Sequence, residues 1–198
     1  MSQFPTETRR SLLFVLAGAL AFAGCATLQE IVSIRDVDFS LTGVTNASLA
    51  GVPITGATSY RDLGAIDGAR IAAAFAGGEL PLETTLQVRA ANPADNSQAR
   101  LVAMDWTLFL DDRETVSGAL QEEYVLPPGE PVTVPVRVRL DLLEFFDRQL
   151  EDVVNLALAA AGGGEPTRIH LEAIPSVQTP LGVVRYPEPI VIGYHVGG

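Results

Sequence analysis

The segment PVTVPVRVRL, residues 131–140, shows the most regular alternation of apolar and polar side chains in the sequence. Valine or leucine occupies the even positions 132–140, and Thr, Pro and Arg occupy the odd positions between them. A period of two predicts a β-strand that buries its Val face and exposes the face with Arg137 and Arg139. Pro135 has no amide hydrogen to give a neighbouring strand, so we expect this strand at the edge of a sheet.

Similar patterns before and after this segment predict a chain that is mainly β. The side chains expected to point inward are Leu86, Val88 and Ala90 in one strand, and Val102, Met104, Trp106, Leu108 and Leu110 in the next. Further strands are predicted at 31–41, with inward Ile34, Val37, Phe39 and Leu41, at 52–55, near 167–173 and near 189–196. Residues 46–60 are rich in Gly, Ser, Thr and Ala, and we expect most of them to form a loop.

Helical patterns occur in two places. Asp67 is positioned to cap a short helix that continues to Phe75 and ends at two glycines. A longer helix is predicted over residues 141–161, where Asp141 and Glu144 have the spacing of a capping box. Its apolar stripe consists of Leu142, Phe146, Leu150, Val153 and Ala157. Because its polar face is acidic, we expect it to pack on the sheet rather than lie on an anionic membrane surface.

The first 24 residues have the pattern of a secretory signal. Arg9 and Arg10 precede an apolar run, residues 12–23, which is too short to cross a bilayer. The run ends at Ala23, Gly24 and Cys25, which resemble a bacterial lipobox, although Phe22 departs from its usual Leu. The alternatives are an ordinary signal peptide or a short anchor with an incidental cysteine.

The lipobox resemblance implies an acylated Cys25 and a protein anchored in the cell envelope. The expected organisation is a signal peptide at 1–24, a lipidated tether at 25–30 and a folded domain at 31–198. Two or three acyl chains would hold the chain to membrane lipid essentially permanently. Ala26 differs from the Asp of an inner-membrane retention signal, so an outer membrane facing the periplasm is expected if the host has two membranes.

Composition excludes several classes of function. The formal net charge of −11 argues against nucleic-acid binding. One Cys and two His make a zinc cage implausible, and Asp105, Asp111, Asp112 and Glu114 lack the spacing of a calcium loop. His170 and His195 fall on the polar phases of their strands, and no nucleophile elbow, phosphate loop or dinucleotide motif occurs. We therefore expect no catalytic residue, no cofactor and no metal.

The order of the motifs resembles that of the late embryogenesis abundant type 2 family (LEA-2), also described as the water stress and hypersensitive response (WHy) domain. The motif positions are Asn92, Pro93, the segment 124–129 (YVLPPG), Thr179, Pro180, Leu181, Gly182, and Tyr186 with Pro187. Ala94 stands where the family commonly has Asn, and residues 42–80 are longer than a minimal domain needs.

This resemblance implies an antiparallel, immunoglobulin- or fibronectin III-like β-sandwich of about seven strands, with one long α-helix packed at its side. Asn92 would have a structural role at the exit of a strand. The implied function is stress protection, such as desiccation tolerance or protection of partly unfolded client proteins from aggregation. Because no catalytic motif occurs, we expect a protein that is not an enzyme, and we expect a monomer. An alternative is a module that binds or transfers a lipid or another apolar ligand between sheet and helix.

Overall fold

The computed structural model describes residues 37–110, 112–146, 149–163, 168–179 and 182–193. The predictions for the signal peptide, Cys25, the tether, Ile34, Asp111, Pro180, Leu181 and His195 lie outside these residues.

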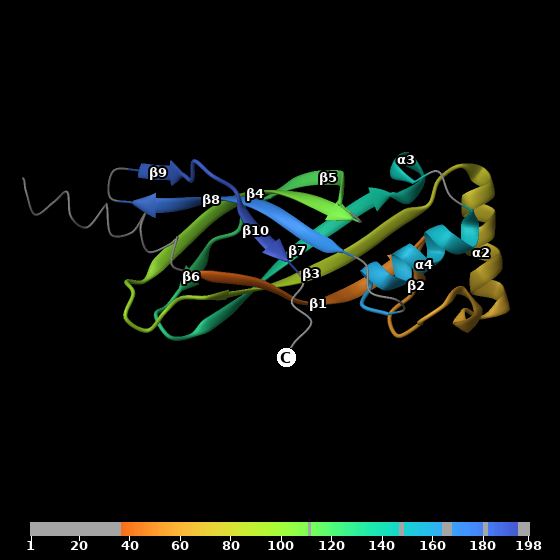
Figure 1. Cartoon of the computed structure of the whole chain (residues 1–198), viewed down its shortest axis with the longest axis horizontal. Helices are drawn as coiled ribbons and strands as arrows, with labels where there is room; N and C mark the ends of the chain where they lie inside the picture. Colours follow the sequence, from red (N-terminus) through yellow and green to blue (C-terminus); the bar gives the residue numbers. More distant parts are fainter. Residues whose placement is uncertain (1–36, 111, 147–148, 164–167, 180–181, 194–198) are drawn as a thin grey trace, which may run out of the picture.

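Two antiparallel sheets form a sandwich (Figure 1), which confirms the predicted fold class. The first sheet contains β1 (Asp38–Leu49), β2 (Val52–Pro53), β3 (Pro81–Ala91) and β7 (Pro131–Asp141), in the order β2-β1-β3-β7. The second contains β4 (Ala99–Leu110), β5 (Arg113–Leu120), β8 (Ile169–Thr179) and β10 (Ile190–Gly193), in the order β10-β8-β4-β5. Two short strands complete it: β6 (Tyr124–Leu126) pairs with β4, and β9 (Gly182–Arg185) pairs with β8.

The predicted phase of β7 is confirmed. The side chains of Val134, Val136, Val138 and Leu140 are buried, whereas Val132 is half-buried. Arg137 and Arg139 point outward and are exposed. Among the described strands β7 pairs only with β3, so Pro135 lies on an edge strand as predicted.

The predicted phase of β4 holds for most of the strand and fails at one position. Met104, Trp106, Leu108 and Leu110 are buried, but Val102 is only half-buried. The pairing of β4 with β8 shifts register between Leu101 and Ala103. One extra residue in the ladder reverses the direction of the side chains, so Ala99 and Leu101 fill the core before this point.

The structure also corrects the loop predicted from residue 46. β1 continues to Leu49, with register shifts between Leu41 and Gly43 and between Thr45 and Ser48. Asn46 has a φ of 54°, in the left-handed region that Asn tolerates better than most residues. Small residues here accommodate irregular pairing within the strand, while Ala47 and Leu49 return to the core.

The single long helix predicted over 141–161 is wrong. The structure has α3 (Leu142–Phe145) and α4 (Leu150–Ala160). The Asp141 carboxylate caps α3 by accepting a hydrogen bond from the Leu143 amide at 2.9 Å. Phe146 then has extended backbone angles and is buried, with the Arg113 guanidinium 5.5 Å from the centre of its ring. Burial of Phe146 thus accompanies the end of the first helical segment.

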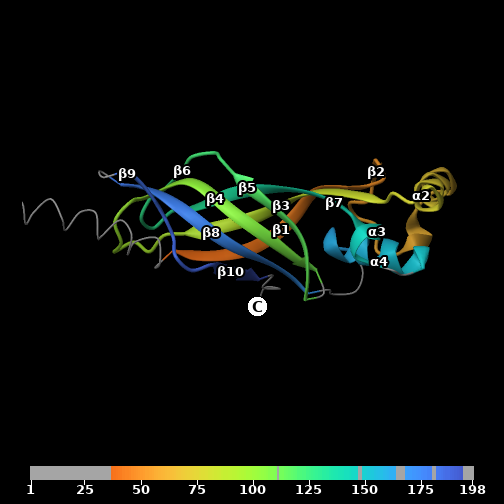
Figure 2. The ribbon, with the colours of Figure 1, turned by 90° about the horizontal axis from the view of Figure 1, so that it is seen from above.

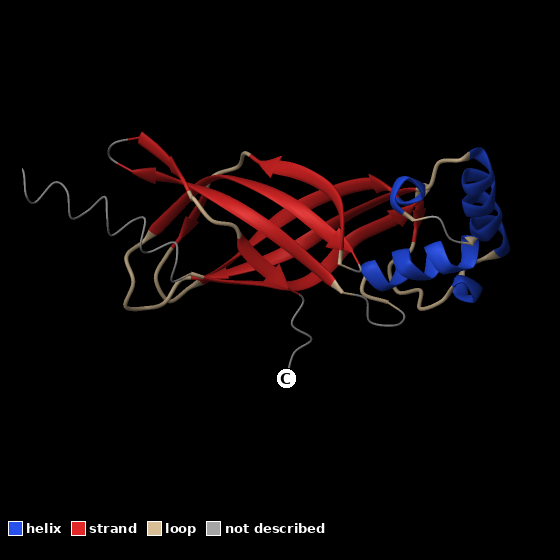
Figure 3. Cartoon of the chain, turned by 45° about the horizontal axis from the view of Figure 1, so that its top comes forward, coloured by secondary structure: helices blue, strands red, loops and turns tan. Residues whose placement is uncertain are grey.

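The helices also lie elsewhere than expected. α3, α4, α2 (Ala65–Gly77) and the short 3-10 helix η1 (Tyr60–Asp62) gather at one end of the sandwich, not at its side (Figures 1 and 3). The segment between β2 and β3 contributes η1 and α2 to this end cap. The Tyr60 amide donates to Asn155 Oδ1 of α4 at 3.2 Å and joins two parts of this cap.

β1 begins at the opposite end of the sandwich (Figures 1 and 2). In the described part of the chain, none of the helices has the length and apolar character that a membrane span requires.

Candidate functional site

A surface depression of about 560 Å³ lies over strands β4, β5 and β8 of the second sheet. Asp105 and Thr107 of β4 lie in its floor, and the pairing of Thr107 with Glu172 and Ser117 brings three strands together there. The Thr107 and Ser117 hydroxyl oxygens are 3.0 Å apart, and Arg185 forms an ion pair with Asp105. The depression is therefore lined by both hydrogen-bonding groups and charges.

On the core face of the same strands, one glycine makes room for a large side chain. Gly118 of β5 lies opposite Trp106 of β4, and the indole ring covers the glycine backbone. A Cβ atom added to Gly118 would lie 2.3 Å from Trp106 Cζ2, so no larger residue fits here without movement of the ring. The apolar surface of the depression itself includes Ile174 and Pro189.

The depression is not the cavity that a lipid carrier was expected to have. It lies on the outer surface of the second sheet, and no residue of α3 or α4 lines it. A carrier of the kind considered from the sequence would hold its ligand between sheet and helix.

His170 of β8 stacks on Phe109 of β4. Their ring centroids are 4.7 Å apart and their planes differ by 7°. His170 is half-buried and belongs to the outward phase of its strand, as the sequence predicted. Within the described residues, no group of three or more His, Cys, Asp or Glu side chains is arranged to hold a metal ion. The arrangement is that of an aromatic pair on a sheet surface.

Asn92 connects three segments where β3 ends. Its side-chain amide donates to the carbonyl oxygens of Ser97 at 2.9 Å and Leu126 at 2.8 Å. Its Oδ1 accepts a hydrogen bond from the Asn96 side chain at 2.9 Å. The Asn92 carbonyl accepts from the Gly129 amide at 2.8 Å. Asn92 and Thr84 are the only buried polar residues among those described, so the other polar side chains there reach the surface.

The other motif positions lie near the ends of strands. Pro93 is exposed and follows Asn92 directly. Gly129 has a φ of 77°, which explains the glycine of the YVLPPG segment. Thr179 of β8 pairs with Gly182 of β9. All of these positions belong to connections at one end of the sandwich, so none of them forms part of the surface depression.

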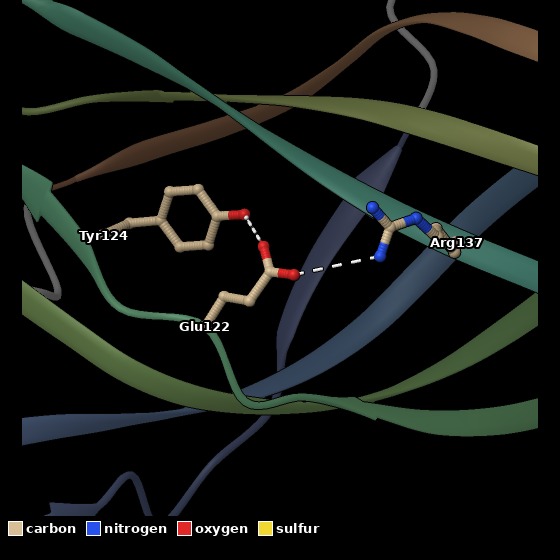
Figure 4. Close-up of polar contacts among 3 residues, drawn as sticks. All are labelled: Glu122, Tyr124 and Arg137. Atoms are coloured by element: carbon tan, nitrogen blue, oxygen red, sulfur yellow. Dashed lines mark hydrogen bonds and ion pairs between the residues drawn. The ribbon is translucent and has the colours of Figure 1, made fainter.

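Glu122 links a tyrosine to an arginine across the edge of the sandwich (Figure 4). It accepts a hydrogen bond from the Tyr124 hydroxyl at 2.7 Å and lies 3.8 Å from Arg137 of β7. Burial raises the pKa of Tyr124 to about 12, and the hydrogen bond and negative charge of Glu122 act in the same direction, while Arg137 opposes them. Because all three side chains reach solvent, we regard the group as a link between β6 and β7.

Replacement of Tyr124 by Phe should change how stability depends on pH. The folded chain holds the Tyr124 proton more tightly than the unfolded chain, whose tyrosines ionise near pH 10. The free energy of unfolding of the wild type should therefore fall as the pH rises from about 10 to about 12. The curve of Tyr124→Phe should be flatter in this range, which urea unfolding at a series of pH values measures. Parallel curves would show that Glu122 and burial do not perturb Tyr124.

Most described arginines are neutralised locally. Arg70, Arg100, Arg137, Arg139 and Arg168 each lie between 2.9 and 3.8 Å from a carboxylate. By contrast, the side chains of Glu79, Asp95, Glu130 and Glu188 are exposed and make no ion pair or side-chain hydrogen bond with another described residue. The excess negative charge is therefore spread over the solvated surface.

The sequence did not reveal the surface depression. The alternation predicts Trp106 in the core and Asp105 on the exposed face, but their proximity to Gly118 and Arg185 depends on strand register. A glycine within an otherwise β-forming segment was the available signal for close packing by a large side chain.

Comparison with known proteins finds similar solved structures, and their sequence identity to this chain is low. No protein-family model and no curated protein matches the chain. A solution structure described as that of a late embryogenesis abundant (LEA) protein is similar, with 12% identity, a TM-score of 0.36, and coverage of 98% of this chain and 94% of that chain.

Two further solved structures are similar. An Arabidopsis thaliana protein has 16% identity and a TM-score of 0.37, with coverage of 57% of this chain and 67% of that chain. A protein from Archaeoglobus fulgidus has 12% identity and a TM-score of 0.33, with coverage of 60% and 87%. With TM-scores below 0.5, the family resemblance continues to rest on the sequence motifs and their positions in the sandwich.

Proposed function

We propose that this chain is a lipid-anchored bacterial envelope protein whose sandwich domain protects other proteins during stress and catalyses no reaction. The LEA-2-like motifs support the protective role, and the lipobox-like Cys25 supports the anchor. The observation that carries the proposal is a folded domain with no buried charged side chain among its described residues and an excess of unpaired surface carboxylates.

The physical basis of protection is a surface that stays hydrated. Exposed carboxylates bind water strongly, and a net charge far from zero keeps a protein soluble and opposes association. A folded domain of this kind makes weak contacts with partly unfolded clients. The negative charges of the bound domains then repel one another and keep the clients apart. Such an effect needs no turnover and no cofactor, and it increases with the number of protective molecules per client.

The anchor would place the domain at a membrane of the cell envelope. Loss of residues 1–24 removes Arg9, Arg10 and Glu7, which changes the net charge from −11 to −12. Because β1 begins at the end opposite the helices, anchoring through Cys25 would direct the helical cap away from the membrane. The expected location is the outer membrane, facing the periplasm, in a host with two membranes.

The change Cys25→Ser should release the protein from the membrane fraction or leave it unprocessed. A hydroxyl group cannot form the thioether that carries the acyl chains, so stable anchoring should be lost. Cell fractionation and mass spectrometry of the mature chain measure both effects. An unmodified Cys25 in the mature wild-type protein would contradict the proposed anchor.

The soluble domain, residues 27–198, should suppress aggregation of a heated or dried client enzyme. Suppression should depend on the molar ratio of domain to client and should need no metal or nucleotide. Light scattering and recovered client activity measure it. His170→Ala should protect as well as the wild type, because the stacked imidazole has no catalytic role in this proposal.

The control for this assay is an unrelated β-sandwich with the same net charge and at the same concentration. If protection depends on how the charges are distributed over the surface of this domain, the control should protect the client less. Equal protection would show a general effect of charge or crowding, and would contradict a specific protective role.

A further inference from the structure

Three neighbouring strands of the second sheet have aligned outward positions, and two of these positions carry rings. Phe109 of β4 pairs with His170 of β8, and His170 pairs with Gly193, which ends β10. The Phe109 and His170 rings are stacked, with their centroids 4.7 Å apart. Neighbouring strands lie about 4.7–4.9 Å apart, so a third ring above Gly193 would continue this stack with the same spacing.

Neither the backbone nor a close neighbour requires glycine at position 193. Gly193 is not among the described residues with a positive φ. A Cβ atom added to it would meet no described atom within 4 Å, whereas a Cβ atom at Gly118 would collide with Trp106. A glycine weakens a strand, and it often marks a place where a ligand or another chain approaches the backbone closely. We therefore looked for a ligand that fits the space above Gly193.

An imidazole and an exposed aliphatic side chain border this space. His170 is half-buried, and Gly193 has no side chain that could cover the imidazole on the side of β10. Val191 lies on the same outward face as Gly193, because Ile192 between them is buried, and it is 62% exposed. Glu172 pairs with Val191, and together with the net charge of −11 it disfavours an anionic ligand. The surroundings suit a ring that stacks on the imidazole and contacts Val191.

We propose that the space above Gly193, beside His170 and Val191, binds an uncharged planar aromatic ring. Stacking on His170 favours such a ring over a saturated group of the same size, because only the aromatic ring has flat faces and a matching distribution of charge. A small aromatic compound or an aromatic side chain of another protein can supply the ring. This site goes beyond the proposed function, which gives His170 no role.

The test follows the NMR resonances of the His170 imidazole protons in the full chain, purified in a non-ionic detergent and kept at constant pH. The chain has two histidines, so the loss of one set of resonances in His170→Ala identifies those of His170. N-acetyl-tryptophan amide should move these resonances upfield in a saturable manner, because a stacked ring shields the protons above its face. N-acetyl-cyclohexylalanine amide, whose ring is saturated, should bind about fivefold more weakly and cause no such upfield shift.

A second probe distinguishes the two sources of the ring. It is an acetylated and amidated peptide, Thr-Val-Trp-Val-Thr, which presents the same ring from a polypeptide backbone. Binding of the peptide about tenfold more tightly than the single amide would support a protein partner. Weaker binding of the peptide would support a small aromatic compound. The absence of a His170 response to both probes would overturn the site.

The decisive variant is Gly193→Val, with Gly43→Val as its matched control. Valine at 193 should fill the space without backbone strain and weaken N-acetyl-tryptophan amide about tenfold or more. Gly43 lies in β1 of the other sheet, and it also has no positive φ and no described atom within 4 Å of an added Cβ atom. Gly43→Val should change binding less than about twofold. Circular dichroism melts should show that both variants fold like the wild type.

Two results would overturn the proposed site. The first is equal binding of N-acetyl-tryptophan amide to Gly193→Val and Gly43→Val. The second is an equal response of His170 to the aromatic amide and to its saturated analogue, and this comparison needs no variant to fold. Client protection is a separate measurement, so its loss or presence does not decide whether a ring binds beside His170.

Discussion

Val136→Asp is expected to destabilise the domain by about 4 kcal/mol or more. Val136 is 1% exposed, and its partner across the ladder is Leu86, which is also buried. The new carboxylate would be removed from water without a cation or a donor nearby. Since small domains have about 5–15 kcal/mol of total stability, this change should remove a large share of it.

The neighbouring change Arg137→Asp supplies the control for this prediction. Arg137 is exposed and takes part only in a surface ion pair with Glu122, so its loss should cost about 1 kcal/mol or less. Urea unfolding or thermal melts of the soluble domain measure both values. Similar losses of stability would show that the phase of β7 is wrong.

Asn92→Ala is expected to reduce the free energy of unfolding by about 3 kcal/mol. The Asn92 side chain is 3% exposed and makes three hydrogen bonds, two of them to backbone carbonyls of different segments. Alanine would leave the Leu126 carbonyl without this donor in a buried place. A lost bond of this kind costs more than the bond contributes, because the remaining group stays desolvated.

Gln98→Ala is the matched control for Asn92→Ala. Gln98 lies in the same connection between β3 and β4, and its side chain is exposed. Its replacement should change stability by less than about 0.5 kcal/mol. Chemical denaturation gives both values, and amide hydrogen exchange at Gly129 should accelerate in Asn92→Ala alone. A loss as small as that of Gln98→Ala would rule out a structural role for Asn92.

The sequence predicted the inward and outward side chains correctly in strands that bury one face. The alternation of Val134, Val136 and Val138 carries this information locally, since a period of two needs no knowledge of partners. The family resemblance supplied the arrangement of two sheets. Around Val102 and Asn46 the same reasoning failed, because a register shift in the pairing decides which side chains turn inward.

The helical cap shows a second reason for failure. The stripe of Leu142, Phe146 and Val153 correctly identified buried side chains, but a stripe does not reveal that the backbone becomes extended at Phe146. Nor does it reveal whether a helix covers the face or the end of a sandwich. Both features depend on packing against residues distant in the sequence, such as Arg113.

The surface depression could not be predicted for the same reason. The residue types of Asp105, Glu172 and Arg185 suggest solvated strands when each strand is considered alone. Their proximity results from the pairing of β4 with β8 and of β8 with β9. For this surface, the sequence showed only that catalytic and cofactor motifs are absent. That the protein has no catalytic activity and no cofactor remains a prediction.

The most direct test of protection by an acidic, hydrated surface is the aggregation assay on a domain that carries fewer surface carboxylates. The variant combines Glu79→Gln, Asp95→Asn, Glu130→Gln and Glu188→Gln, which removes four exposed carboxylates without an ion-pair partner among the described residues. Its control exchanges Glu for Asp, and Asp for Glu, at the same positions and keeps the charge. The variant with fewer carboxylates should melt like the wild type but protect the client less, while the control should protect fully. Equal protection by both would contradict protection by such a surface.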